Sequence, residues 1–572
     1  MRWINRQLPL EDHIHSLADA LSTKRPFPLS LANILVQRNI NSYEQAKAFF
    51  VPDKSALHDP FLMKNMALAV NRVIEAKEKD EKILVFGDYD VDGTSAVSLL
   101  SLFLEEWQFK YLTYIPDRYQ EGYGISYQGI DFAKEKEARL MIALDCGIKA
   151  VDKVRYANQK EIDVIICDHH RPGKELPPAL AVLDPKQSDC PYPFKELTGC
   201  GVGLKLIQGV HQRLLQKGHK PQHEHFDPFE SYSDLVTLST ACDIVPIEGE
   251  NRTISYYGLQ KLRSNPLPGI GAIMKQAKSQ REWDISDLVF FVGPRINSAG
   301  RLGHANDAVE VLMGKSHRLD LLADDLQTSN DTRKGIDRQI TEEALALIAA
   351  DNTYADKSTT VLYNPSWHKG VIGIVASRLI EQHYRPTILL TQTEGKLVGS
   401  ARSVAGFDLY EALQACSEHL LQFGGHKYAA GMSMKEEHFE AFSQQFDQVV
   451  SQQILPEQKV PVLYIDHELK FSEITPRFIR LLNRLEPFGP GNRKPIFMSK
   501  AVEVLNAKVL KDVHIKFALQ QGDCKFEAIG FSMAEKWAQT RHELLDIAFQ
   551  PIFNTWNHTT KINLQLKDFR LS

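Results

Sequence analysis

Three apolar, strand-like runs, each with an aspartate at or just beyond its end, constrain the fold of this chain most strongly. They occupy residues 83–86, 138–147 and 161–170, and a polar helical segment at 148–160 separates the last two. A strand, a helix and a strand with short connections predict a parallel α/β sheet, in which ligands bind beyond the carboxyl ends of the strands. We therefore expect the aspartates at the ends of these runs to converge on one edge: Asp88, Asp90, Asp145 and Asp168.

The first run leads into three aspartates at alternate positions, Asp88, Asp90 and Asp92, followed by Gly93. This spacing satisfies the first half of an EF-hand loop. That loop also requires a Glu at its twelfth position, which here is Leu99, and it follows a helix rather than a strand-like run. A calcium loop is therefore excluded, and carboxylates this close together still need a cation to offset their repulsion.

Two further segments add potential ligands. "CDHHRP" places His169 and His170 behind an aspartate, and "STACDIVP" places Asp243 in an apolar run where an unpaired carboxylate would be costly. Taken singly, an aspartate after a strand is more often a helix cap, and a histidine pair is more often structural. Taken together, carboxylates with imidazole and no thiolate pattern favour Mg²⁺ or Mn²⁺ over structural zinc.

Composition narrows the class of protein. A length of 572 residues predicts three or four domains, and a formal net charge of -5 means that any nucleic-acid contact must come from a local basic path. The seven cysteines form no CxxC pair, which argues against a disulfide framework and for a reducing cytosol. No apolar signal region or run of about 18 apolar residues is present, so we expect a cytoplasmic protein without a membrane contact.

The pattern along the chain predicts five parts. These are a helical N-terminal arm (1–55), an α/β domain (56–316), a long connector helix (317–352), a smaller α/β domain (353–447) and a small β-barrel such as an OB-fold (458–572). The connector is mostly polar with a narrow apolar stripe, and the last part carries several short strand-like runs.

These residues match a family. "GDYDVDG", "LDCG", "DHH" and "ACDIVP", in this order, resemble the four acidic motifs of the DHH phosphoesterases. "RYQEGYG", "PRINSAGRLG", "GSARS", "GGHKYAAGM" and "EPFGPGN" narrow the resemblance to the RecJ family, bacterial exonucleases that digest single-stranded DNA from 5′ to 3′. The resemblance covers roughly residues 30–570. It implies two α/β domains, named DHH and DHHA1, joined by the connector helix and followed by an OB-fold.

The resemblance also implies roles for the acidic residues. Two divalent cations, Mn²⁺ or Mg²⁺, would be held by Asp88, Asp90, Asp92, Asp145, His169 and Asp243, with Asp145 bridging and Asp92 counted among the catalytic residues. His170 would contact the scissile phosphate or assist proton transfer, and Asp168 would orient the imidazoles. Many superfamily members have a metal-binding histidine where this chain has Phe86, so direct ligation by Asp88 is less certain than by Asp90 and Asp92.

Strand recognition is implied for three groups of residues. Arg295, Asn297 and Arg301 would bind phosphate, Ser400, Arg402 and His426 would bind the 5′-phosphate, and Arg118 and Tyr123 would contact the terminal nucleotide. The barrel would guide the strand through Trp556 and the basic residues Arg493, Lys494, Lys508 and Lys511. Plain packing remains an alternative for Tyr123 and Trp556, and a surface turn with incidental arginines remains one for residues 294–303.

The predicted function is a metal-dependent exonuclease that releases 5′-mononucleotides from single-stranded DNA in recombination, mismatch repair and base-excision repair. The expected partners are single-strand-binding protein and a helicase, the expected state is a monomer, and the groove is expected to exclude duplex. One alternative is a DHH phosphodiesterase of short oligonucleotides or cyclic dinucleotides, against which the connector and barrel count. Another is a catalytically dead scaffold, against which the intact acidic motifs count.

Overall fold

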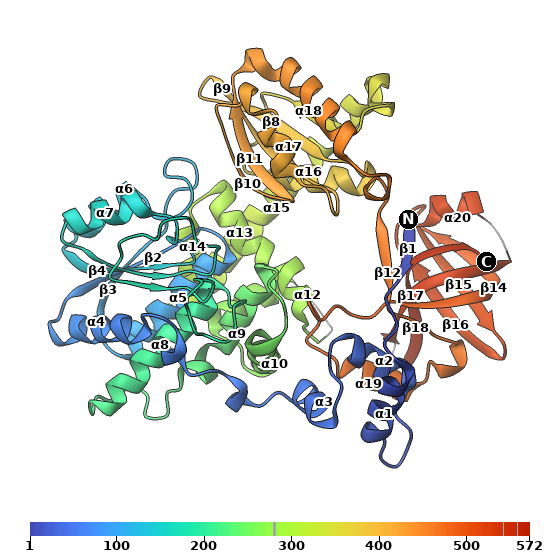
Figure 1. Cartoon of the computed structure of the whole chain (residues 1–572), viewed down its shortest axis with the longest axis horizontal. Coiled ribbons are helices and arrows are strands. Elements are labelled where there is room, and N and C mark those ends of the chain that lie inside the picture. The colour runs from blue at the N-terminus through green and yellow to red at the C-terminus, as the bar shows by residue number, and fades with distance from the viewer. Residues whose placement is uncertain (278–281, 541–542, 557–558) are drawn as a thin grey trace. The chain divides into compact units, whose positions relative to one another are not determined.

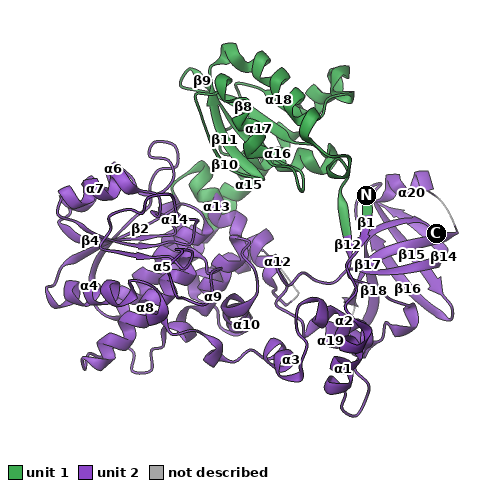
Figure 2. Ribbon diagram, viewed as in Figure 1, with its two compact units in different colours: residues 1–2, 298–304, 324–463 green, residues 3–297, 305–323, 464–572 purple. Residues whose placement is uncertain are grey.

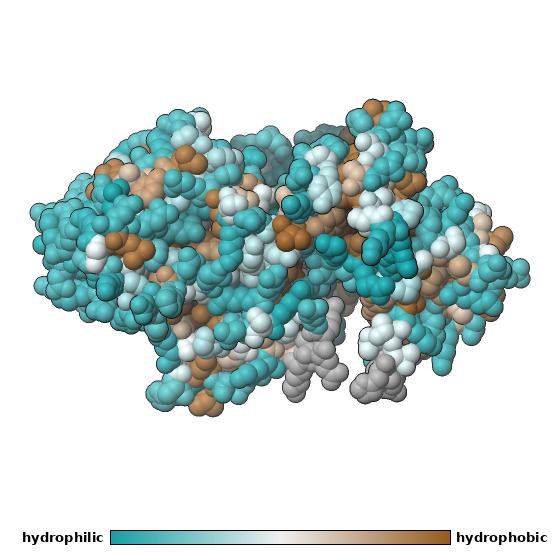
Figure 3. Space-filling view, turned by 90° about the horizontal axis from the view of Figure 1, so that it is seen from below, coloured by the Kyte–Doolittle hydropathy of each residue, from teal (hydrophilic) through white to brown (hydrophobic). Residues whose placement is uncertain are grey.

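The structure is a computed structural model that describes residues 1–277, 282–540, 543–556 and 559–572. The chain divides into two compact units (Figure 2). The smaller contains residues 1–2, 298–304 and 324–463, and the larger contains residues 3–297, 305–323 and 464–572. Among the described residues, no helix is both long and apolar enough to cross a membrane. On the face drawn in Figure 3, apolar residues form small patches scattered among hydrophilic ones.

The larger unit contains a five-stranded parallel sheet with the order β3-β2-β4-β5-β6 (Figure 1). Its strands are β2 (Lys82–Gly87), β3 (Lys110–Tyr114), β4 (Ala138–Leu144), β5 (Asp163–Cys167) and β6 (Ala181–Leu183). β2, β4 and β5 are buried almost throughout, which explains why their sequences are continuous apolar runs rather than alternating ones. The predicted parallel α/β fold of this region is confirmed.

Helices cover both faces of this sheet. α6 (Tyr127–Glu135) and α7 (Val151–Gln159) pack on one face over a core that includes Phe86, Met141 and Ile166. The other face carries α4 (Met66–Glu78), α5 (Val91–Glu106) and α8 (Gly199–Gln216). Behind them lie α9 (Pro228–Cys242) and α10 (Gly249–Ser264), and the unit also contains α11 (Pro268–Gln276), α12 (Ile285–Asp287) and α14 (Ala305–Met313). The helix α13 (Gly293–Leu302) has its first residues in this unit and residues 298–302 in the smaller one.

The predicted connector is a helix. α15 (Leu319–Ala350) has 32 residues, which corresponds to about 48 Å at 1.5 Å per residue. The smaller unit then forms a five-stranded mixed sheet with the order β10-β11-β9-β8-β7. Its elements are β7 (Thr360–Tyr363), α16 (Ile372–Gln382), β8 (Thr387–Thr393), β9 (Lys396–Arg402), α17 (Leu409–Gln414), β10 (Gln422–His426), β11 (Ala429–Met434) and α18 (Phe439–Gln453). The second α/β fold is therefore also confirmed.

The C-terminal region is a β-barrel, as predicted. Strand β14 (Phe497–Leu510) pairs with both β15 and β17, which closes the sheet into a barrel. The first two residues of β14 also pair with the short strand β13 (His467–Glu468). The remaining elements are β15 (His514–Gln521), β16 (Cys524–Gly530), α20 (Ala534–Thr540), β17 (Leu544–Trp556) and β18 (Thr559–Leu571). The side chain of Trp556 lies outside the described part of the chain.

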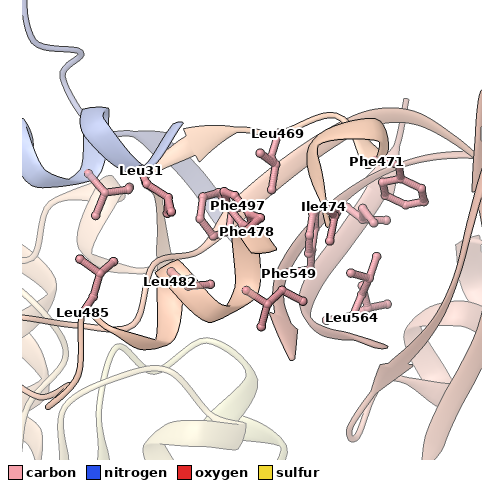
Figure 4. Close-up of a cluster of buried hydrophobic side chains, with 14 of the residues drawn as sticks. Leu31, Leu469, Phe471, Ile474, Phe478, Leu482, Leu485, Phe497, Phe549 and Leu564 are labelled. Atoms are coloured by element: carbon pink, nitrogen blue, oxygen red, sulfur yellow. The ribbon is translucent and has the colours of Figure 1, made fainter. Parts of the chain in front are cut away.

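The N-terminal arm is helical but does not stand apart. It contains β1 (Arg2–Asn5), which pairs with β12 (Val462–Ile465), and the helices α1 (Glu11–Leu21), α2 (Leu29–Gln37) and α3 (Tyr43–Phe50). α1 and α2 contribute to the same hydrophobic core as the barrel strands and α19 (Pro476–Asn483). Figure 4 shows Leu31 of α2 beside Phe478 and Phe497 in this core.

Candidate metal and phosphate sites

The acidic motifs meet at the carboxyl edge of the parallel sheet. β2, β4 and β5 end directly before Asp88, Asp145 and Asp168. Asp243 arrives separately, as the residue that ends α9. The result is a cluster around the buried His169, whose Nε2 atom lies 3.2 Å from Asp145 Oδ1, 3.6 Å from Asp92 Oδ2 and 3.6 Å from Asp243 Oδ2. Stretches of chain far apart in sequence therefore converge, as predicted.

Asp92 is held by the N-terminus of α8. Its Oδ2 atom accepts a hydrogen bond from the Gly199 N–H at 2.7 Å, and its Oδ1 atom accepts from the Cys200 N–H at 2.8 Å and from Ser239 Oγ at 2.6 Å. The free N–H groups and dipole of a helix N-terminus favour a carboxylate at this position. Asp90 instead caps the N-terminus of α5, because its Oδ1 atom accepts a hydrogen bond from the Gly93 N–H at 3.0 Å.

These anchors were not identified from the sequence. Ser239 stands four residues before Asp243, one helical turn away in the motif "STACDIVP", so its shared face with Asp243 was a usable signal. Gly199 is required by close packing, because a Cβ atom at this position would lie 2.5 Å from the Asp145 Cβ atom. Asp145 itself has a φ of 58°, a left-handed conformation that aspartate tolerates better than most residues.

Asp168 and His170 form a charged pair beside the cluster. Asp168 Oδ1 lies 2.7 Å from His170 Nδ1, and Asp168 Oδ2 accepts from the Ile148 N–H at 2.9 Å. Burial alone would lower the pKa of His170, but the hydrogen bond and negative charge of Asp168 raise it to about 9. Burial would likewise raise the pKa of Asp168, whereas His170 and backbone N–H groups lower it to about 2. His170 is therefore a cation at neutral pH, with its Nε2 atom 3.3 Å from the Tyr123 hydroxyl.

The other carboxylates repel one another. Burial, followed by the negative charges of Asp92 and Asp90, raises the pKa of Asp145 well above its usual range and that of Asp243 to about 8. Burial lowers the pKa of His169, which leaves its imidazole neutral, the form that binds metals. A cluster in which acids resist ionisation and a histidine stays neutral is typical of a cation site.

The residues present fit a divalent cation. Among the described residues, four buried atoms here have no hydrogen-bond partner: Asp88 Oδ1, Asp145 Oδ1, His169 Nδ1 and His169 Nε2. Such atoms are costly unless a ligand satisfies them. Within two groups, Asp92–His169–Asp243 and Asp145–His169–His170, the potential ligand atoms lie within 4.8 Å of one another. In the second group Asp168 keeps the His170 ring protonated, so Asp145 and His169 are the members suited to a metal. This oxygen-rich set with imidazole suits Mg²⁺ or Mn²⁺.

Asp88 and Asp90 lie outside these two groups. Phe86, which stands where many superfamily members have a ligand histidine, is fully buried and stacks on Tyr114 with 5.5 Å between the ring centroids. It belongs to the core on the α6 and α7 face of the sheet. Asp88 follows on the same strand end with a carboxylate that is buried and has one unsatisfied oxygen.

The smaller unit brings together three of the predicted phosphate residues. Arg402 Nη1 donates to Ser400 Oγ at 3.0 Å, and Arg301 Nη1 donates to the Gly370 carbonyl at 2.8 Å. Gly373, three residues after Gly370, lies close to the other two side chains. A Cβ atom at this position would be 2.7 Å from Ser400 Oγ and 2.9 Å from Arg402 Nη2. The start of α16 thus lies against the Ser400 and Arg402 side chains. Neither Gly370 nor Gly373 was identified from the sequence.

The remaining predicted residues have varied surroundings. His426 is exposed at the end of β10, which pairs through β11 with the end of β9 that carries Arg402. Arg118 lies over the Tyr89 ring, 4.8 Å from its centroid, and Tyr123 is 52% exposed. Arg295 and Asn297 lie on the helix α13 rather than in a turn, and Arg295 is buried and donates to the Phe291 carbonyl.

The sequence of this chain matches known proteins over its full length. Three family models match: the DHH family, N-terminal domain at residues 82–240, the DHHA1 domain at 356–452 and the RecJ OB domain at 465–568. The single-stranded-DNA-specific exonuclease RecJ of Bacillus subtilis (strain 168) is 35% identical over an alignment that covers 100% of this chain and 71% of that protein. The chain belongs to the RecJ family.

Solved structures of the RecJ family agree with the fold. A crystal structure of RecJ in complex with Mn²⁺ from Thermus thermophilus has a TM-score of 0.84 at 27% identity, covering 100% of this chain and 80% of that one. A second from the same organism, in complex with Mg²⁺, has a TM-score of 0.79 at 26% identity and covers 100% and 78%. Both ions are those that the donor set of the acidic cluster suits.

Proposed function

We propose that this protein is a single-stranded-DNA-specific exonuclease that digests its substrate from the 5′ end and releases 5′-mononucleotides. The observation that carries the proposal is the cluster at the sheet edge, where Asp92, Asp145 and Asp243 surround the unsatisfied Nε2 atom of His169. Membership of the RecJ family and the match to the RecJ OB domain support single-stranded DNA as the substrate.

The acidic cluster is proposed to hold two divalent cations, Mn²⁺ or Mg²⁺. Asp88, Asp90, Asp92, Asp145, His169 and Asp243 would hold them. Such a pair of cations activates water and stabilises the charge that develops on a phosphodiester during in-line displacement. The α8 N-terminus and Ser239 fix the Asp92 carboxylate, so that it keeps one orientation before substrate arrives.

His170 is proposed to act on the scissile phosphate. Asp168 binds its Nδ1 atom and keeps the ring protonated, which leaves Nε2 to donate a hydrogen bond or a proton to a phosphate oxygen. The Tyr123 hydroxyl donates to the Asp145 carbonyl at 3.1 Å and so keeps its ring beside His170. Tyr123 and Arg118 are proposed to contact the terminal nucleotide.

The cluster at the start of α16 is proposed to bind the 5′-phosphate. Arg301, Ser400, Arg402 and His426 supply donors, and the glycines at 370 and 373 allow the backbone to approach closely. A fixed site for the 5′-phosphate would set the direction of digestion. Arg295 and Asn297 belong to the same proposal as contacts along the strand.

The wider setting is also a proposal. We place the enzyme in the cytoplasm as a monomer that acts in recombination and repair beside single-strand-binding protein and a helicase, with the domain boundaries predicted above. The barrel would guide the strand through its basic residues, supported by the match to the RecJ OB domain.

The test uses single-stranded oligonucleotides labelled at the 5′ or the 3′ end, with Mn²⁺ or Mg²⁺. The wild-type protein should release the 5′ label first, as a mononucleotide. Asp92→Asn should reduce the rate at least about a hundredfold, because a ligand and its helix contacts are both altered. Asp131→Asn, which changes an exposed carboxylate on α6, is the matched control and should keep full activity. Equal rates for Asp92→Asn and wild type, or release of the 3′ label first, would overturn the proposal.

A further inference from the structure

A cavity of about 210 Å³ lies beside His170, on the side of α7. Its lining includes Tyr123, Ile148, Lys149, Lys153 and His170. Asp168, which is bound to His170, also lines the cavity, and small or apolar residues at 124–125, 147 and 150 form the rest of its wall. The cavity therefore combines apolar groups and an aromatic ring with two lysine side chains and the Asp168–His170 pair. We refer to it as the lysine pocket.

The two lysines have no carboxylate partner. Among the described residues, neither Lys149 nor Lys153 forms an ion pair, although two acids lie on or near the same helix. Asp152 and Glu175 are both bound by Arg155, at 2.8 Å from its Nη1 atom and 2.6 Å from its Nη2 atom. These two carboxylates are therefore bound to Arg155, and Asp168, the carboxylate that lines the cavity, is bound to His170.

Further cations extend the positive charge of the lysines along the loop after His170. Arg171 and Lys174 are exposed, and within the described part of the chain neither is in an ion pair. The loop lies beside Lys149, because a Cβ atom on Gly173 would be 3.7 Å from Lys149 Cγ. Four cationic residues therefore lie on two segments that meet at Lys149 and Gly173, next to the acidic cluster. A phosphate backbone is attracted to such cations and repelled by the acids beside them.

We propose that the lysine pocket binds the nucleotide on the 3′ side of the scissile phosphate, next to the terminal nucleotide. Its base would lie against the apolar wall beside Tyr123, and Lys149 and Lys153 would bind its 3′-phosphate. This inference rests on the proposed exonuclease function and adds a binding subsite to it. The lysines position the strand and take no part in the chemical step.

The test compares the double variant Lys149→Ala/Lys153→Ala with wild type in two assays. The first is the Kd for a fluorescent oligothymidylate, measured by anisotropy in Ca²⁺, which fills oxygen-rich sites. The second is steady-state digestion of the same oligonucleotide in Mn²⁺. The double variant should raise Kd and KM roughly tenfold and leave kcat within about twofold, as expected for lost strand binding. Each phosphate contact on a single strand contributes about 0.7 to the salt dependence of log Kd. Because both lysines bind the same phosphate, the slope should fall by about 0.7.

Two further double variants serve as controls. Lys149→Arg/Lys153→Arg keeps both charges, so its Kd and salt slope should equal those of wild type. Lys217→Ala/Lys220→Ala removes the same number of charges just beyond the C-terminal end of α8. This helix has 18 residues, so its C-terminal end lies about 27 Å from the residues that bind Asp92. The Kd and the salt slope of this variant should match those of wild type.

If Lys149→Ala/Lys153→Ala left the Kd and the salt slope unchanged, the proposal that the lysine pocket binds a nucleotide would be wrong, whether or not wild type digests DNA. A fall in kcat with unchanged KM would also overturn it, since the lysines would then act on the chemical step. Failure of wild type to digest single strands would overturn the exonuclease proposal alone, because the binding assay in Ca²⁺ is read separately.

Discussion

The charge of His170 depends on the side chain two positions before it. Asp168 accepts hydrogen bonds from the His170 ring and from the backbone N–H groups of Ile148, His169 and His170. A carboxylate bound by this many donors stays ionised, and it then stabilises the protonated ring. The adjacent histidine has no such partner and stays neutral. The two neighbouring histidines thus differ in charge. The protonated His170 is suited to binding a phosphate, and the neutral His169 is suited to binding a metal.

We expect NMR titration of the protein in EDTA to give the His170 ring a pKa of about 9, and Asp168→Asn to lower that pKa toward its ordinary value of 6.5. The raised pKa of His170 means that its contribution to stability is complete below pH 6.5 and is lost as pH rises through about 9. The lowered pKa of Asp168 means that its contribution is present above pH 3.8 and lost as pH falls through about 2.

The loss of Tm in Asp168→Asn should therefore be greatest between pH 3.8 and 6.5 and should shrink above pH 9. Thermal unfolding in EDTA at a series of pH values measures this. If the pKa of His170 remained near 9 in the variant, the pair would not be the cause of the shift.

At the scale of elements, the first turn of α8 organises the cation site without offering a side chain to it. Its N–H groups bind Asp92, and the missing side chain of Gly199 leaves room for Asp145. Ser239, on α9, adds a third donor to Asp92. The first turn of α8 and Ser239 of α9 therefore hold Asp92, which lies at the start of α5, and leave room for Asp145 at the end of β4.

Gly199→Ala should lower the affinity for Mn²⁺ by roughly 10- to 100-fold, because the added methyl group would displace Asp145. Titration calorimetry measures this affinity, and circular dichroism checks that the fold is kept. The matched control is Gly203→Ala, one turn later, where a Cβ atom would lie in ordinary contact 3.4 Å from Leu144. That change should leave Mn²⁺ affinity intact and raise stability by about 1 kcal/mol, the helix preference of alanine over glycine. An equal loss of affinity in both variants would show that the close packing at Gly199 is not responsible.

The same elements show what the sequence could and could not predict. The strand ends that carry Asp88, Asp145 and Asp168 were predictable, because buried parallel strands are continuous apolar runs and their carboxyl ends share an edge. The contact between Asp92 and the start of α8 spans more than a hundred residues and depends on how that helix packs on the sheet. No local pattern encodes such a distance. Gly373 was missed for the same reason, since its closeness to Ser400 comes from the packing of α16 on β9.

At the scale of the whole chain, the two ends of the sequence share one hydrophobic core. Helices α1 and α2 lie within the first 40 residues, yet they pack with strands and a helix that begin after residue 468 (Figure 4). The barrel is therefore not an independent C-terminal module, because part of its core comes from the N-terminus. Bringing together segments this far apart in sequence has an entropic cost of loop closure, which burial of apolar surface must offset.

Leu31→Ala should destabilise this shared core by about 2–5 kcal/mol, the usual cost of removing a buried leucine side chain. Leu31 is 1% exposed, whereas Leu29 on the same helix is 46% exposed, so Leu29→Ala is the matched control and should change stability little. Hydrogen exchange should lose protection in β14, β15 and β17 in the first variant, far from the residue changed in sequence. Mn²⁺ affinity should stay at the wild-type value, because the cation site stands on the separate core of the parallel sheet. Loss of protection confined to α1 and α2, with the barrel strands unaffected, would show that the N-terminal helices only cover the barrel rather than complete its core.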